Sequence, residues 1–187
     1  MDNQLSHVTE SYLSRFYEIL DTMIQEMTSV ELNNSISRNF ILQMIPHHQA
    51  AIEMSRNLLQ YTTNVELQNI ALNIIRTQSA SIESMMRALN RCSTEMNNNT
   101  DVINYQNAFD ELTERMFNNM ANAPISNNID VNFIREMIPH HIGAIEMSRN
   151  ALRFPLCVEL NNILRDIIIS QSNGVQQMRA ILEQIEG

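Results

Sequence analysis

An internal repeat constrains this chain more than any other feature of its sequence. Residues 39–57 read NFILQMIPHHQAAIEMSRN and residues 132–150 read NFIREMIPHHIGAIEMSRN, with fifteen of nineteen positions identical at an offset of 93. Chance does not produce identity at this level, so the pattern indicates a duplicated unit. We therefore expect each copy of the Met-Ile-Pro-His-His motif to sit in the same local structure.

The repeat divides the chain into two units, residues 1–96 and 97–187, with the junction near the Asn-rich stretch 97–100. Each unit contains three apolar segments, separated by clusters of Asn, Ser, Thr or Pro that are typical of loops. We expect the segments at about 4–31, 38–60, 65–91, 98–121, 131–153 and 158–185.

Apolar residues recur at helical spacing within these segments. One stripe in the third segment consists of Leu67, Ile70, Ile74, Ile82, Met85 and Leu89, and one in the first consists of Leu13, Phe16, Leu20, Met23 and Met27. Asn64 precedes the third segment as a helix N-cap. Only 3 Gly and 4 Pro leave little room for the tight turns of a many-stranded sheet. The sequence predicts an all-α, antiparallel helical bundle of two tandem three-helix repeats, forming either two bundles or one shared bundle.

The charge of the chain excludes some classes of partner. A net charge of −9 and a pI near 4.9 argue against binding to nucleic acid or to anionic lipid. No apolar run is long enough for a membrane span, and the first residues show no secretory signal, so we expect a cytoplasmic protein. The two cysteines, Cys92 and Cys157, are too few for a disulfide framework or a Cys-rich zinc site. We expect both to be unpaired thiols.

The repeated motif places soft metal ligands on one helix face. Residues three, four, seven and ten apart share a face of a helix, so a thioether, an imidazole and a second thioether line up in each unit. The ligands on this face are Met44, His47 and Met54 in the first unit and Met137, His140 and Met147 in the second. His48 and His141 lie about 100° around the helix from their neighbours, so adjacent histidines cannot point the same way. If the copies pack around a pseudo-two-fold axis, His47 and His140 would approach and form one shared site.

The ligand types favour copper over iron. Thioether and imidazole suit Cu(I), and imidazole alone also suits Cu(II), zinc and nickel. Di-iron helical proteins use Glu-x-x-His, but Met44 and Met137 stand three residues before His47 and His140. The nearest carboxylates, Glu53 and Glu146, lie off this face and could serve only in a second shell.

Three polar or rigid features next to the motif have more than one reading. Pro46, like Pro139, either lies inside a helix that begins near Ser37, freeing the carbonyl of Leu42, or opens a helix at its first turn. Gln78 and Gln171 interrupt the apolar stripe, so a buried amide there would orient a histidine or bind the freed carbonyl. His7 has no counterpart and is expected to be exposed.

Two hypotheses of different class follow. In the first, the chain is a non-enzymatic metal-binding bundle that buffers or carries copper. In the second, the methionines are core filler, the histidines are satisfied by backbone, and the chain is a structural module that self-associates into a homo-oligomer. Duplication would copy either arrangement. An enzyme is the weakest reading, because no nucleophile–base pair, phosphate loop or carboxylate cluster is visible.

The motif Met-Ile-Pro-His-His-x-x-Ala-Ile-Glu-Met, followed by a helix with Gln and a later Met, resembles the bacterial "domain of unknown function 305" family over residues 38–91 and 131–185. The resemblance implies a ferritin-like helical bundle, and some members are implicated in copper binding or copper tolerance. It also implies that Met85 and Met178 match the later Met. By the same resemblance, the metal ligands are His47, His48, Met44, Met54, His140, His141, Met137 and Met147. The chain departs from copper-handling members, which are usually exported, in lacking an export signal and Met-rich tails.

Overall fold

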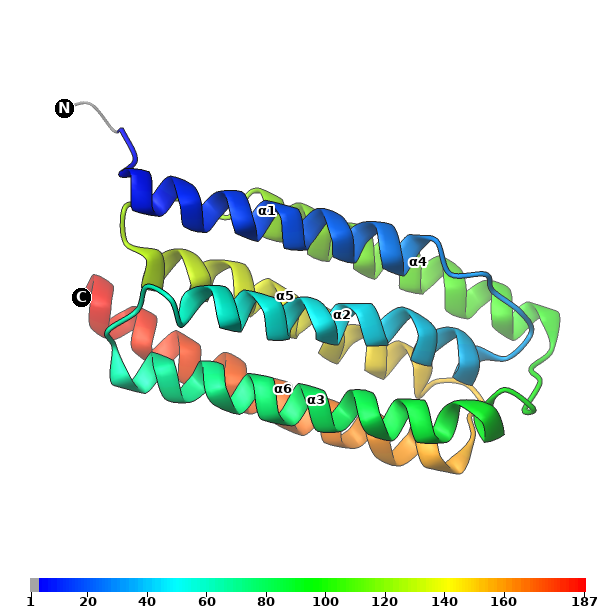
Figure 1. Cartoon of the computed structure of the whole chain (residues 1–187). Helices are drawn as coiled ribbons and strands as arrows, with labels where there is room; N and C mark the ends of the chain where they lie inside the picture. The colour runs from blue at the N-terminus through cyan, green and yellow to red at the C-terminus, as the bar shows by residue number, and fades with distance from the viewer. Residues whose placement is uncertain (1–3) are drawn as a thin grey trace.

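Six α-helices joined by short connections make up the computed structural model, which describes residues 4–187 (Figure 1). The helices are α1 His7–Thr28, α2 Ile36–Leu58, α3 Val65–Cys92, α4 Asn99–Ala121, α5 Ile129–Ala151 and α6 Val158–Glu186. The prediction of an all-α bundle is confirmed. Among these described residues, no helix is long and apolar enough to cross a membrane.

The helices form three layers of two. In Figure 1, α1 and α4 lie along one face, α2 and α5 in the middle, and α3 and α6 along the opposite face. α2 contacts α1, α3 and α5, while α5 contacts α4, α6 and α2. One continuous cluster of buried apolar side chains contains residues of both units. The two units therefore share a single core, and the paired motif helices lie at its centre.

Local sequence signals account for where the helices begin. The side chains of Ser6, Ser35, Asn64, Asn98 and Asn128 each accept a backbone N–H bond in the first turn of the following helix, and the predicted Asn64 cap is confirmed. All the stripe residues of α1 are buried. The stripe of α3 is buried at four positions, while Ile82 and Leu89 are partly buried against the same core.

A disulfide between Cys92 and Cys157 joins the end of α3 to the start of α6. The prediction of two unpaired thiols is wrong. The cysteines are 65 residues apart in sequence, but the antiparallel bundle brings their Cα atoms to 5.3 Å. Both cysteines are buried in the core, and two serines bind their backbones: the Ser35 hydroxyl donates to the Cys92 carbonyl at 2.9 Å, and the Cys157 N–H donates to the Ser37 hydroxyl at 3.0 Å.

A second cross-unit contact joins α1 to α5 through a buried carboxyl group. The Tyr12 hydroxyl donates to Glu136 Oε2 at 2.6 Å. Burial raises the pKa of Glu136 to about 8, although the bond from Tyr12 lowers it. The repeat-equivalent residues are Tyr105 and Gln43, whose hydroxyl and amide oxygen are buried without a hydrogen-bond partner in the described part of the chain. Of the two equivalent positions, only the one in the second unit therefore carries a buried carboxyl group.

The disulfide gives a direct prediction about stability. Replacing Cys92→Ser together with Cys157→Ser should lower the free energy of unfolding by up to about 4 kcal/mol, because the bond closes a long loop in the unfolded chain. Urea unfolding of the variant and the parent measures this difference. Reducing the parent with a dithiol should reproduce the shift, and equal midpoints for the oxidised and reduced parent would contradict it.

Glu136 should make stability depend on pH. Because its pKa rises from the usual 4.5 to about 8 on folding, folding takes up a proton. The stability that its protonated form contributes is complete below pH 4.5 and is lost as the pH rises through 8. Between pH 6.5 and 9 the parent should lose roughly 1–2 kcal/mol of stability relative to Glu136→Gln, which lacks the carboxyl group.

Urea titrations at several pH values within this window measure the loss. The buried histidines also contribute, because they are neutral in the folded state but titrate near pH 6.5 in the unfolded chain, so their contribution to stability increases as the pH rises through that value. This contribution is the same in the parent and in Glu136→Gln, so the difference between the two profiles isolates the carboxyl group. Gln43→Glu, at the equivalent position of the first unit, should steepen the loss. An unchanged pH profile in Glu136→Gln would exclude this carboxyl group as the cause.

Candidate metal centre

Four buried imidazoles form a row across the interface of α2 and α5. The rings of His47 and His140 stack with centroids 3.7 Å apart and planes 29° apart. His48 and His141 flank them, with centroids 5.8 Å from His47 and 5.9 Å from His140 respectively. The structure thus brings the two motifs together at one place, as a pseudo-two-fold arrangement of the copies requires. The adjacent histidines diverge, as their helical spacing predicts.

One hydrogen bond fixes the protonation of His140. Its Nε2 lies 3.0 Å from the backbone carbonyl oxygen of His47, and because a carbonyl only accepts, Nε2 carries the proton. A neutral ring then presents an unprotonated Nδ1, which is a lone-pair donor. Nδ1 of His140 has no hydrogen-bond partner.

The other ring nitrogens are similarly free among the described residues. The buried imidazole nitrogens without a partner are His47 Nδ1 and Nε2, His48 Nδ1, His140 Nδ1 and His141 Nδ1. Burial lowers the pKa of His48 to about 3 and that of His140 to about 4, and it holds those of His47 and His141 well below 6.5. All four rings are therefore neutral at physiological pH and available as ligands.

The methionines of the motif are also buried. Met44, Met54, Met137 and Met147 are each at most 1% exposed. They lie on the same helices as the histidines, α2 and α5, at the spacing already described. Pro46 and Pro139 lie inside α2 and α5, which begin at Ile36 and Ile129, so the reading in which a helix starts at the proline is wrong.

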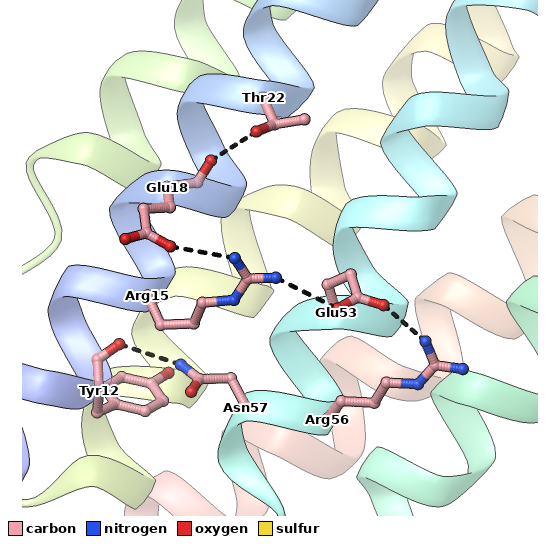
Figure 2. Close-up of polar contacts among 7 residues, drawn as sticks. All are labelled: Tyr12, Arg15, Glu18, Thr22, Glu53, Arg56 and Asn57. Atoms are coloured by element: carbon pink, nitrogen blue, oxygen red, sulfur yellow. Dashed lines mark hydrogen bonds and ion pairs between the residues drawn. The ribbon is translucent and has the colours of Figure 1, made fainter.

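The carboxylates next to the motif point away from the histidines. Glu53 accepts hydrogen bonds from Arg15 of α1 and from Arg56, as Figure 2 shows, and Glu146 accepts one from Arg115. These are partly exposed surface ion pairs. A second-shell role for Glu53 and Glu146 is therefore wrong, because the helical face that carries them looks toward α1 or α4 and solvent.

The polar neighbours of the row differ from expectation. Gln78 and Gln171 are buried, yet the Oε1 of each lacks a partner, so neither makes the expected bond through this atom within the described chain. Sequence reasoning missed Glu136, which lies one helical turn before His140. The signal was present, because Glu136 replaces Gln43 within the nearly identical repeat. His7 is exposed as predicted and pairs with Glu10.

The histidine row does not present three converging imidazoles. Within residues 4–187, the one group of three His, Cys, Asp or Glu ligand atoms that all lie within 4.8 Å of one another is Cys92, Cys157 and Glu159. Two of its members are joined in the disulfide, so that group offers no free thiolate.

Several solved structures share this architecture. CopM in its Ag-bound form is 31% identical with a TM-score of 0.61, over 81% of this chain and 97% of that one. CopM in its Cu(I)-bound form is 30% identical with a TM-score of 0.61, over 81% and 98%. A DUF305 fragment from Deinococcus radiodurans, 22% identical with a TM-score of 0.59 over 80% and 96%, shares the fold. No curated protein matches the chain.

One family model also matches. It is described as "Domain of unknown function (DUF305)", and the match covers residues 23–182. This range runs from α1 into α6 and includes both copies of the motif and all four histidines of the row. The match extends over well more than half of the chain, and it agrees with the structural neighbours. The chain belongs to the DUF305 family.

Proposed function

We propose that this chain binds a soft metal ion, Cu(I), at the histidine row and acts without catalysis as a copper buffer or carrier. The observation that carries the proposal is that every one of the four buried rings has a nitrogen without a hydrogen-bond partner among the described residues. Each such group left unsatisfied costs about 1–3 kcal/mol. A neutral ring offers one lone pair, since its other nitrogen carries the proton. A metal ion that accepts the lone pairs of these rings would offset part of that cost, which a purely structural core would not need to bear.

The chemistry of the neighbouring side chains favours Cu(I). Methionine sulfur is a soft ligand that binds Cu(I) well and hard ions poorly, and Met44, Met54, Met137 and Met147 are its sources here. The CopM structures to which this chain is similar include Ag-bound, Cu(I)-bound and Cu(II)-bound forms. This likeness supports copper as the metal, with Ag(I) as a redox-inert substitute in experiments.

One shared centre fits the geometry better than two separate sites. His47 and His140 are in direct ring contact, and a hydrogen bond joins the ring of His140 to the backbone of His47. Because the rings are stacked, an ion bound in the plane of one ring lies near the edge of the other. We therefore infer that both motifs contribute to the same centre.

The prediction of a cytoplasmic location stays untested, and the disulfide argues against it. Disulfides persist mainly in oxidising compartments and are rare in the reducing cytosol. We infer that the chain works where Cys92 and Cys157 remain oxidised.

A competition titration of tag-free protein against a Cu(I) chelator tests the proposal. The parent should bind more tightly than about micromolar. His47→Ala with His48→Ala, and separately His140→Ala with His141→Ala, should each weaken binding by more than roughly 100-fold. Retention of half the bound copper in each double variant would contradict a shared centre, and absence of binding by the parent would contradict the function.

The role of the methionines as ligands can be tested without creating a cavity in the core. Met44→Leu with Met137→Leu nearly conserves volume, so the cost in stability should stay below about 1.5 kcal/mol per site. The affinity for Cu(I) should fall, because leucine offers no lone pair. Met86→Leu with Met96→Leu is the matched control, since both side chains are largely exposed. Equal affinities of the two variants for Cu(I) would exclude Met44 and Met137 as ligands.

Metal binding should also raise thermal stability. At a free Ag(I) concentration of 100 times Kd, the folded state gains about 2.7 kcal/mol, which should raise the Tm of the parent by several degrees. The variant with His47→Ala and His48→Ala should show no such rise. If the Tm of the parent is the same with and without Ag(I), the self-associating structural module is favoured instead.

A further inference from the structure

A second cluster of metal-ligand atoms lies at the disulfide, outside the histidine row. The Sγ atoms of Cys92 and Cys157 and a carboxylate oxygen of Glu159 all lie within 4.8 Å of one another. They come from the end of α3 and the start of α6, which meet at one end of the bundle (Figure 1). Zinc binds thiolate at about 2.3 Å and carboxylate oxygen at about 2.0–2.2 Å, so its tetrahedral ligands lie roughly 3.5–4 Å apart. The three atoms are therefore near the spacing of a zinc site once the sulfurs are no longer bonded to each other.

Hydrogen bonds hold the backbones of both cysteines in place independently of the disulfide. The Ser35 hydroxyl donates to the Cys92 carbonyl at 2.9 Å, and the Ser37 hydroxyl accepts from the Cys157 N–H at 3.0 Å. Ser35 is the N-cap of α2 and Ser37 lies in its first turn, so the start of one helix positions both cysteines. Cleaving the S–S bond therefore leaves two thiols side by side.

Cys157 occupies a position that stabilises a thiolate. It is the N-cap of α6, and among the six helices of residues 4–187 it is the one N-cap whose side chain makes no capping hydrogen bond. The equivalent residue of the first unit, Asn64, does cap α3. The second unit thus has a cysteine where the first has an effective capping residue. The partial positive charge at a helix N-terminus favours the thiolate, which is the form of cysteine that binds metal.

Glu159 connects this cluster to solvent. Its side chain is 33% exposed and forms an ion pair through Oε1 with Arg91, which is 77% exposed. An ion pair this exposed contributes little to stability, so the carboxylate can turn to another cation at low cost. Arg91 and Glu159 also lie in the wall of a surface hollow of about 380 Å³ between α3 and α6. The carboxylate is therefore accessible to an ion from solvent, although the two sulfurs are buried.

We propose that reduction of the Cys92–Cys157 disulfide opens a zinc site, in which the two thiolates and the Glu159 carboxylate bind Zn²⁺ and water fills the fourth position. A dithiol reductant supplies two electrons and two protons, so that the protein gains two thiols and the reductant becomes a disulfide. Zn²⁺ then displaces both protons as it binds the sulfurs. A disulfide oxidant reverses the sequence: it takes two electrons from the sulfurs and two protons from water, the S–S bond forms again and Zn²⁺ leaves.

The mixed donor set favours zinc over copper at this place. Thiolates suit both Zn²⁺ and Cu(I), but Zn²⁺ also binds carboxylate oxygen well. A chain is synthesised with free thiols, so the site is open before the disulfide forms and again whenever a reductant cleaves it. None of the histidines or methionines of the row takes part, and the inference does not depend on the proposed copper function.

Cobalt spectroscopy of the reduced protein tests the site. The parent, reduced with a phosphine and desalted without oxygen, should bind Co²⁺ with a thiolate-to-cobalt charge-transfer band in the near ultraviolet. Zn²⁺ should abolish the band by displacing Co²⁺, and the oxidised parent should show no band. The proposal is overturned if the reduced parent shows no band, or if the variant with Cys92→Ser and Cys157→Ser shows the same band.

A competition titration with a chromophoric chelator tests the carboxylate. Glu159→Gln should weaken the binding of Zn²⁺ to the reduced protein by at least about tenfold, since even the loss of an outer partner of a metal ligand costs about that much. Arg91→Gln breaks the same ion pair but keeps the carboxylate, and it should not weaken binding. Glu66→Gln, at the equivalent position of the first unit, is the matched control and should equal the parent. Equal affinities of Glu159→Gln and Glu66→Gln would overturn Glu159 as a ligand.

Circular dichroism of the reduced protein covers the case in which reduction unfolds it. Zn²⁺ should then restore the helical signal of the parent but not that of the variant with Cys92→Ser and Cys157→Ser, because an ion that binds the folded state stabilises it. Failure of Zn²⁺ to restore the signal would overturn the site.

Two further outcomes define what the site does. Oxidation of the zinc-loaded parent with a small disulfide should release Zn²⁺ to a zinc-responsive dye, and retention of the ion would overturn its coupling to the disulfide. The variant with His47→Ala and His48→Ala should keep the cobalt band when reduced. The zinc site and the copper function can therefore fail separately, and loss of the band in this variant would overturn the site's independence from the histidine row.

Discussion

The contact between α2 and α5 at the stacked rings of His47 and His140 is the interaction around which the rest of the molecule is arranged. It places four imidazoles at the centre of a core that is mostly apolar. Buried polar groups are normally hydrogen-bonded. Among the described residues, the four rings make one hydrogen bond, from His140 Nε2 to the backbone carbonyl of His47. The outer helices α1, α3, α4 and α6 then exclude water from this centre, which lowers the pKa of every imidazole in it.

Most of the fold could be predicted because its signals are local. Helical periodicity, the Asn64 cap and the clusters of loop residues act within a few residues, and together with the repeat they identified all six helices. The shared core could not be predicted from these signals. Whether two three-helix units pack together or apart depends on how their exposed faces fit, and the sequence states which residues are apolar but not which face meets which.

The errors at the site have the same cause. The pairing of Cys92 with Cys157 depends on the end of α3 lying beside the start of α6, which no spacing reveals. Glu53 and Glu146 are near the histidines in sequence but bind arginines at the surface. Successive residues of a helix point about 100° apart, so residues close in sequence can lie on opposite faces. The meeting of His47 and His140 followed from symmetry, and symmetry is the one long-range relation that a repeated sequence does contain.

The departures from that symmetry carry the more specific information. Glu136 in place of Gln43 gives one unit a buried acid, Gly143 in place of Ala50 leaves space that Met116 fills, and Gly174 in place of Ser81 lets the backbone of α6 lie against His141. A duplicated core needs none of these differences in order to pack. The buried acid one turn before His140 and the close approach of α6 to His141 both belong to the second unit. The two halves of the histidine row therefore have different surroundings, although the repeat makes their imidazoles and thioethers identical.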